Sequence, residues 1–178
     1  NKNPLLLHAG DMIGASPPVS ALLRDEPTIE FLNTLGFDIG TIGNHEFDRG
    51  SDELLRLLKG SRPSASKDYS GSHFPWIAAN VINQKSGKPF LPPYKIKYIS
   101  GTPIGFIGVI MRETPAITAP DSVKGLIFTD EAEAINKYAR ELKKQGVRAI
   151  VVLAHVPGES RPNGQQASGQ LIDLAHLV

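Results

Sequence analysis

The sequence has 178 residues, of which 40% are hydrophobic and 21% charged, a composition typical of one globular domain with a sizeable core. Its 19 basic and 18 acidic residues leave a net charge of +1, which provides no overall attraction to nucleic acid or to an anionic membrane, and no apolar run reaches the roughly 18 residues of a membrane-spanning helix. The absence of cysteine excludes disulfides, thiolate metal sites and cysteine nucleophiles, so any metal must be bound by His, Asp, Glu or Asn.

In the first part of the chain, short apolar runs alternate with amphipathic stretches, which favours a layered α/β fold. The expected elements are strands at 4–9 and 37–42 and helices at 19–35 and 51–59. The first helix is expected in one or two pieces, with Asp25 as a cap, Pro27 in its first turn and Gly36 at its end. Ser51 is expected to cap the second helix.

The remainder of the chain continues this alternation, without an internal repeat or a domain boundary. The expected elements are a mobile loop at 61–75, strands at 76–79, 94–99, 104–110 and 149–154, a helix at 129–145 capped by Thr129, a loop at 157–169 and a last helix from 170. The strands on either side of residues 100–103 are expected to form a hairpin. The strand at 149–154 is uniformly apolar, as expected for a strand covered on both faces.

Polar residues follow four of the expected strands, at Asp11, Asn44–His45, Asn80 and His155. The carboxyl ends of strands in an open α/β sheet face one crevice, where ligands bind. Taken singly, each residue has an ordinary interpretation. An Asp or Asn after glycine is common in turns, a lone His after an apolar run is more often a core residue, and Asn80 can simply begin a loop.

Together these residues form a more specific pattern. It consists of the segments GDMIGASP at 10–17, NTLGFD at 33–38 and GNHEFD at 43–48. The chain resembles the calcineurin-like metallophosphoesterases, and in particular the bacterial 5′-nucleotidase branch, which includes 2′,3′-cyclic nucleotide phosphodiesterases. Residues 79–81 and 151–155 fall where that branch has matching elements, so the resemblance covers nearly the whole chain.

The resemblance implies a layered metallophosphoesterase fold, with mixed β-sheets flanked by helices, and a site for two divalent metal ions. It assigns Asp11 as the carboxylate that bridges the ions, and Asn44 and His155 as further ligands of the second ion. Two such ions activate a water molecule and neutralise phosphate oxygens. Mixed nitrogen and oxygen ligands suit zinc, manganese, cobalt or iron and do not choose among them.

The resemblance assigns His45 a catalytic role rather than a metal-binding one. As an imidazolium, His45 would stabilise the charge on phosphoryl and leaving-group oxygens, and Asp48 would orient its ring. Asp48 also has an ordinary interpretation as a residue near a helix start. Asn80 is a weaker candidate for contact with the substrate phosphate. Arg112 and Arg161 could meet a phosphate, but solvated surface arginines are the preferred interpretation.

Residues 1–178 are expected to be a partial catalytic domain. The family's Asp-x-His motif, on a strand before the Gly-Asp segment, is absent from the sequence. So are its Gly-His-x-His or Gly-His-x-Gln motif and its C-terminal substrate-binding domain. The first ion would therefore retain only Asp11, leaving at most one well-ligated site. We expect little activity from these residues alone, and self-association through strand edges left unpaired.

The expected function of the parent protein is hydrolysis of nucleotide phosphate esters, with a nucleotide as substrate. The alternatives are a 2′,3′-cyclic nucleotide phosphodiesterase or a nucleotide-sugar hydrolase with the same catalytic domain, and, in another class, a non-catalytic structural or binding module. The resemblance also implies an exported protein, in the periplasm or cell wall.

Overall fold

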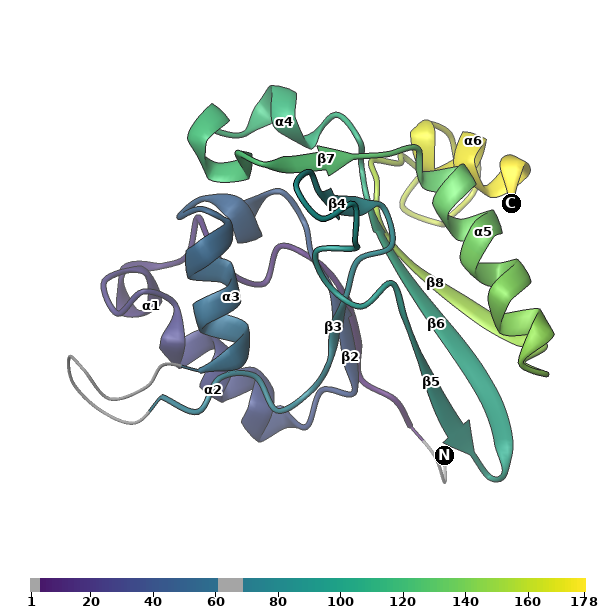
Figure 1. The fold of residues 1–178 in the computed structure, drawn as a ribbon, viewed down its shortest axis with the longest axis horizontal. Coiled ribbons are helices and arrows are strands. Elements are labelled where there is room, and N and C mark those ends of the chain that lie inside the picture. Colours follow the sequence, from purple (N-terminus) through teal and green to yellow (C-terminus); the bar gives the residue numbers. More distant parts are fainter. Residues whose placement is uncertain (1–3, 61–68) are drawn as a thin grey trace.

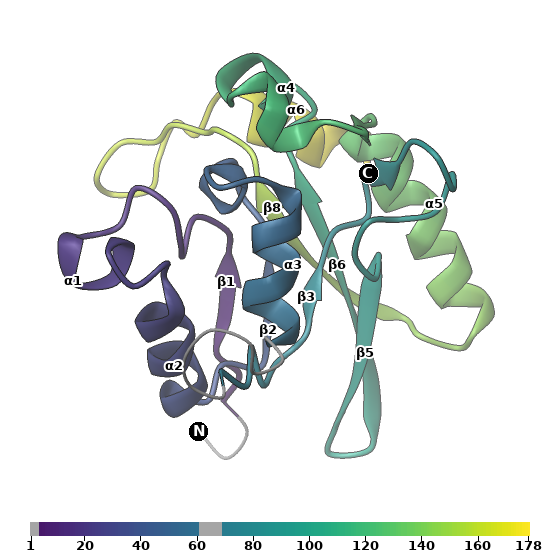
Figure 2. The same ribbon diagram turned by 60° about the vertical axis from the view of Figure 1, so that its left-hand side comes forward.

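The computed structural model describes residues 4–60 and 69–178, which form three small β-sheets with helices on their outer sides (Figures 1 and 2). In chain order the elements are β1 (Leu7–Ala9), α1 (Pro18–Ala21), α2 (Glu26–Leu35), β2 (Ile39–Thr41), the 3₁₀ helix η1 (His45–Phe47), α3 (Ser51–Lys59), β3 (Trp76–Ile77), β4 (Val81–Asn83), β5 (Tyr94–Ile99), β6 (Thr102–Ile110), α4 (Thr114–Ile117), the 3₁₀ helix η2 (Pro120–Val123), β7 (Leu126–Phe128), α5 (Glu131–Lys144), β8 (Ala149–His155) and α6 (Gln170–Leu177).

The sheets combine parallel and antiparallel pairing. Strands β1, β2 and β3 are parallel to one another, β6 is antiparallel to β5 and parallel to β8, and β4 pairs with β7 in a separate antiparallel ribbon. Helices α1 to α3 lie on one side of the molecule, and α5 and α6 lie on the other (Figure 1). The predicted layered α/β fold with mixed sheets and flanking helices is confirmed.

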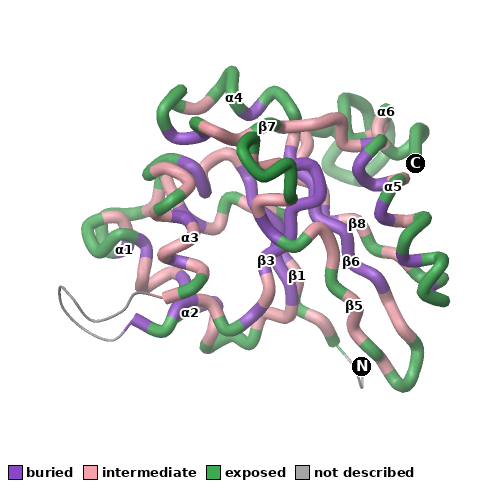
Figure 3. Tube along the Cα trace, viewed as in Figure 1, coloured by how far each residue is buried: buried purple, intermediate pink, exposed green. Residues whose placement is uncertain are grey.

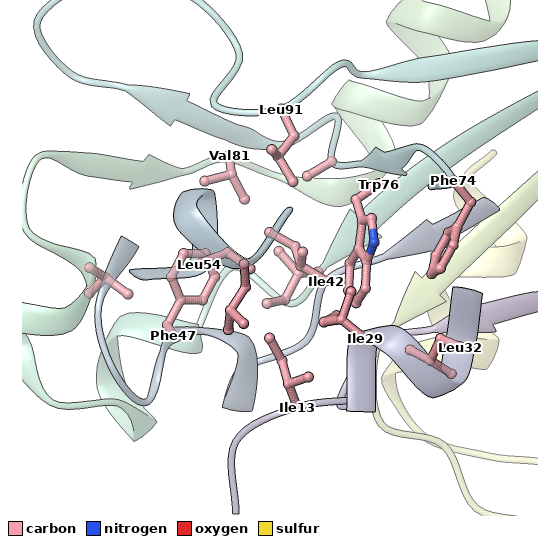
Figure 4. Close-up of a cluster of buried hydrophobic side chains, with 14 of the residues drawn as sticks. Ile13, Ile29, Leu32, Ile42, Phe47, Leu54, Phe74, Trp76, Val81 and Leu91 are labelled. Carbon is pink, nitrogen blue, oxygen red and sulfur yellow. The ribbon is translucent and has the colours of Figure 1, made fainter. Parts of the chain in front are cut away.

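The largest apolar core lies between the β1–β2–β3 sheet and helices α2 and α3. Ile29 and Leu32 from α2 and Leu54 and Leu57 from α3 are buried there. Figure 4 shows how these helices meet side chains from the sheet and from the loops. Full burial of one such side chain stabilises the fold by about 1.5–3 kcal/mol, so these four side chains together contribute substantially to its stability.

Two predicted features of the chain path are confirmed. The helix expected at 19–35 is divided into α1 and α2, with Pro27 in the first turn of α2 and Gly36 in the left-handed conformation at its end. The predicted hairpin is formed by β5 and β6.

The predicted helix caps were wrong. Asp25 precedes α2, but its backbone is left-handed, with φ of 63°, and its side chain caps no helix N–H group. Instead its carboxylate accepts a hydrogen bond from Ser20 Oγ at 3.0 Å. Gly50 precedes α3 in place of Ser51. Asp130 caps α5 in place of Thr129, because its carboxylate accepts the N–H of Glu133 at 2.9 Å.

The expectation that β8 is covered on both faces was also wrong. Residues 149–152 of β8 alternate between exposed and half-buried, and Val151 is 37% exposed. Among the described strands β8 pairs with β6 alone, so it forms a sheet edge, whereas β2 and the second half of β6 are buried (Figure 3). The unbroken apolar run at 149–154 therefore does not correspond to a strand that is covered on both faces.

Part of the loop expected at 61–75 is anchored. Residues 61–68 lie outside the described residues, but Tyr69 is buried and its hydroxyl donates to the Leu57 carbonyl at 2.8 Å. Strands β4 and β7 and helix α4, which are three or four residues long, were not predicted from the sequence. No helix in the described part of the chain has the length and apolar character needed to cross a membrane.

Candidate functional site

Two loops that leave neighbouring parallel strands form the candidate site. One loop follows β1 and the other follows β2, and they approach closely at Gly10 and Gly43. A Cβ atom on Gly10 would lie 2.5 Å from the Gly43 nitrogen, and one on Gly43 would lie 2.2 Å from Oδ1 of Asp11 and 2.6 Å from Cε1 of His155. Only glycine at these positions permits the observed arrangement.

Asp11 lies at the centre of the site in a conformation that L residues rarely adopt, with φ of 55°. Its Oδ1 accepts the backbone N–H of His45 at 3.0 Å, and its Oδ2 lies 3.4 Å from Nε2 of His155. The two carboxylate oxygens therefore face different parts of the site.

His155, the last residue of β8, completes a cluster of three polar atoms. Its Nδ1 lies 2.8 Å from the carbonyl oxygen of Ala9, which can only accept, so Nδ1 carries the proton. Nε2 lies 3.1 Å from Oδ1 of Asn44 and 3.4 Å from Oδ2 of Asp11. An imidazole nitrogen, an amide oxygen and a carboxylate oxygen thus lie together, and with Nε2 unprotonated all three offer lone pairs, a donor set that suits a divalent cation. Within residues 4–60 and 69–178, no group of three or more His, Asp or Glu side chains could hold a metal, so this set depends on the amide oxygen of Asn44.

A second pair of side chains flanks this cluster. Nδ1 of His45 lies 3.0 Å from Oδ2 of Asp48, which also accepts the backbone N–H of Ala15 at 3.0 Å. The hydrogen bond to Asp48 raises the pKa of His45, which favours the imidazolium. The His45 side chain is 41% exposed, so its ring is open to a molecule from solvent.

Glu46 joins the two loops, a role that was not predicted from the sequence. Glu46 is 3% exposed, and its carboxylate accepts backbone N–H groups from Asp11, Met12 and Gly43. Burial raises the pKa of Glu46, while these N–H donors act in the opposite direction. The sequence offered one indication of this role, because Glu46 is an acidic residue in a tight loop between buried segments. A buried carboxylate requires hydrogen-bond donors.

Asn80 does not join the site. It is 0% exposed, and its Nδ2 donates to the carbonyl oxygens of Ile110 at 2.6 Å and Thr129 at 3.0 Å, while its Oδ1 accepts the N–H of Ile110. Both Nδ2 protons of Asn80 therefore bond to carbonyl oxygens in the core. Neither is left for the expected contact with a substrate phosphate. Arg112 is exposed and pairs with Glu113 and Asp130, in keeping with a surface role; Arg161 is also exposed.

The fold that carries this cluster is that of the calcineurin-like phosphoesterases. The calcineurin-like phosphoesterase family model matches residues 1–176, and the chain belongs to that family. The chain is 51% identical to a Bacillus subtilis protein named endonuclease YhcR and 43% identical to the Listeria monocytogenes cell wall protein Lmo0130, covering 98% and 94% of this chain and 14% and 22% of those relatives.

Two further similarities confirm the predicted branch of the family. The chain is 30% identical to a Salmonella typhimurium 2′,3′-cyclic-nucleotide 2′-phosphodiesterase/3′-nucleotidase, over 99% of this chain and 28% of that relative. The crystal structure of a 5′-nucleotidase precursor from Thermus thermophilus superimposes with a TM-score of 0.69 and 31% identity, over 85% of this chain and 28% of that one. The chain thus spans less than a third of the length of each of these relatives.

Proposed function

We propose that this chain provides part of a two-metal site that hydrolyses phosphate esters of nucleotides. The observation that carries the proposal is the convergence of Asp11 Oδ2, Asn44 Oδ1 and His155 Nε2 beside the His45–Asp48 pair. Divalent ions, when bound, supply a water nucleophile of lowered pKa and neutralise the phosphate oxygens. In this proposal Asp11, Asn44 and His155 hold one ion, and Asp11 also contributes to the second.

His45 acts on the substrate itself. Because its Nδ1 is bonded to Asp48, Nε2 is the ring nitrogen available to an exogenous oxygen. An imidazolium at this position donates a hydrogen bond to the ester oxygen that becomes the leaving group, and it can protonate the departing alcohol. Asp48 keeps the ring oriented and favours its charged form.

The remaining ligands of the second ion and the contacts to the nucleoside belong, in this proposal, to parts of the protein outside these 178 residues. We therefore propose little hydrolytic activity for this chain by itself. The test measures manganese binding to this chain and hydrolysis of AMP and 2′,3′-cyclic AMP by this chain and by longer versions of the protein. A chain that binds no manganese would favour the non-catalytic structural module, and family-like turnover by the isolated chain would contradict the partial-site proposal.

A second candidate substrate is the phosphodiester backbone of a nucleic acid. It is favoured by the 51% identity to the relative named endonuclease, although the net charge of +1 offers no general attraction to such a polymer. Incubation of a longer version of the protein with linear DNA, RNA, AMP, 2′,3′-cyclic AMP and UDP-glucose separates these candidates from one another and from a nucleotide-sugar hydrolase. We also propose an exported or cell-wall location, supported by the relative named cell wall protein, which cell fractionation tests.

A further inference from the structure

We infer that Glu46 is a positioning residue that couples the loop after β1 to the loop after β2 and thereby places Asp11 for cation binding. The inference rests on the proposed function, because it concerns the same candidate cation site. Glu46 contacts none of the three clustered donor atoms directly. It is argued to act through the backbone of Asp11.

The contacts of Glu46 divide between the two loops. Oε2 accepts the N–H of Asp11 at 2.8 Å and the N–H of Gly43 at 2.5 Å, so one oxygen links both loops. Oε1 accepts the N–H of Met12 at 2.8 Å and that of Ile13 at 3.4 Å. Every one of these partners is a donor, and an ionised carboxylate satisfies four donors where a neutral amide cannot.

These bonds act on an unfavourable backbone conformation. Gly10 and Asp11 both have positive φ, of 94° and 55°, and an Asp in this region requires support from its surroundings. The N–H groups of Asp11 and of the next two residues converge on the Glu46 carboxylate, which provides that support.

The conformation held in this way determines where the Asp11 carboxylate lies. Oδ1 accepts the N–H of His45 and Oδ2 lies 3.4 Å from Nε2 of His155. A small rotation at Asp11 would move both oxygens, and groups that support metal ligands in this manner typically change metal affinity by about 10- to 100-fold when they are altered. Glu46 is buried, so it acts without touching a ligand or substrate.

Two substitutions separate positioning from charge. Glu46→Gln keeps the length of the side chain but removes its charge and replaces one acceptor oxygen with a donor. Glu46→Asp keeps the charge but shortens the side chain by one methylene, so the carboxylate cannot reach both loops in the observed manner. Glu53→Gln is the matched control, because Glu53 is a mostly buried carboxylate that binds Arg24 and Arg56 and neither loop.

The experiment measures the affinity of the 178-residue chain for Mn²⁺ by electron paramagnetic resonance, with circular dichroism to confirm that each variant is folded. We expect both Glu46 variants to bind about tenfold more weakly or worse, and Glu53→Gln to retain the wild-type affinity even if it is less stable. Wild-type affinity in Glu46→Asp overturns the inference and leaves the proposed function intact. A wild-type chain that binds no Mn²⁺ overturns the proposed function and this inference with it.

A second measurement keeps the inference testable if both Glu46 variants fail to fold. Amide hydrogen exchange of the wild-type chain is compared with and without the diamagnetic ion Zn²⁺. We expect the amides of Asp11, Met12 and Gly43, which all donate to Glu46, to slow together when Zn²⁺ binds. Exchange that slows only at residues other than these three would contradict the coupling.

Discussion

Nε2 of His155 lies 3.1 Å from Oδ1 of Asn44, although the two residues are 111 positions apart in the chain. The N–H of the other ring nitrogen donates to the carbonyl oxygen of Ala9, which orients Nε2 toward the amide oxygen. When Nε2 is unprotonated, both atoms offer lone pairs, and a bound divalent cation satisfies both. This relationship makes metal binding the first property to test.

We predict that His155→Ala weakens Mn²⁺ binding to this chain on the order of tenfold or more, because it removes the only nitrogen among the three clustered donors. Calorimetry or paramagnetic resonance measures the change. His176→Ala is the control, since His176 lies on α6, outside the cluster, and its substitution is expected to leave affinity unchanged. Equal Mn²⁺ affinity in the wild type, His155→Ala and His176→Ala would show that the ion binds at a site other than this cluster.

We predict that Gly43→Ala abolishes Mn²⁺ binding at concentrations that saturate the wild type. The added Cβ would lie 2.2 Å from Oδ1 of Asp11 and 2.6 Å from the His155 ring, so both donors must move. Gly87→Ala serves as the control. Its Cβ would contact nothing within 4 Å, and only its φ of 65° opposes the substitution, at a cost of about 1–2 kcal/mol of stability without loss of binding. Binding by Gly43→Ala would show that the cluster tolerates expansion.

We predict that Asp48→Asn lowers the pKa of His45, because the hydrogen bond to Asp48 is the main cause of its elevation. The imidazole resonances of the metal-free chain, titrated by NMR, report this change directly. Asp52→Asn, on α3, is expected to leave the titration of His45 unaltered. In a longer, active version of the protein we expect Asp48→Asn to lower kcat by about 100-fold or more, as for loss of assisted proton transfer. An unshifted titration would remove Asp48 from the mechanism.

We predict a loss of stability in mild acid that is caused by His8. This ring is buried among Phe37, Phe74 and Trp76, and burial lowers the pKa of His8 from 6.5 to about 4. The unfolded chain therefore binds a proton that the folded chain excludes between these two values. Stability is complete above pH 6.5 and falls by about 3 kcal/mol as the pH is lowered to 4. Urea unfolding of the wild type and of His8→Leu measures the effect, and an equally steep pH dependence in His8→Leu would assign it to other groups.

We predict that Asn80→Ala destabilises the fold by about 2–3 kcal/mol without changing the affinity for Mn²⁺. The substitution leaves the carbonyl oxygens of Ile110 and Thr129 and the N–H of Ile110 without their buried partner. Thermal unfolding and metal titration measure the two quantities separately. A clear loss of metal affinity in folded protein would return Asn80 to the site.

Local patterns were sufficient for much of the fold. The hairpin of β5 and β6, the division between α1 and α2, and α5 all follow from turn residues and from hydrophobic periodicity within a single segment. The short strands β4 and β7 could not be predicted in this way. Each has only three residues and depends for its hydrogen bonds on a partner strand more than 40 positions away in the chain, with Val81 opposite Phe128 and Asn83 opposite Leu126.

The amino-acid sequence by itself determined the family, through the segments at 10–17, 33–38 and 43–48, because tight turns and polar side chains at strand ends are encoded locally. Only the tertiary structure decided which groups the buried polar residues bind. Glu46 binds the backbone of the loop after β1, and Asn80 binds two carbonyl oxygens of the core. Backbone N–H and carbonyl groups are the same at every residue, so no sequence pattern shows which of them a buried carboxylate or amide will meet when distant segments pack together.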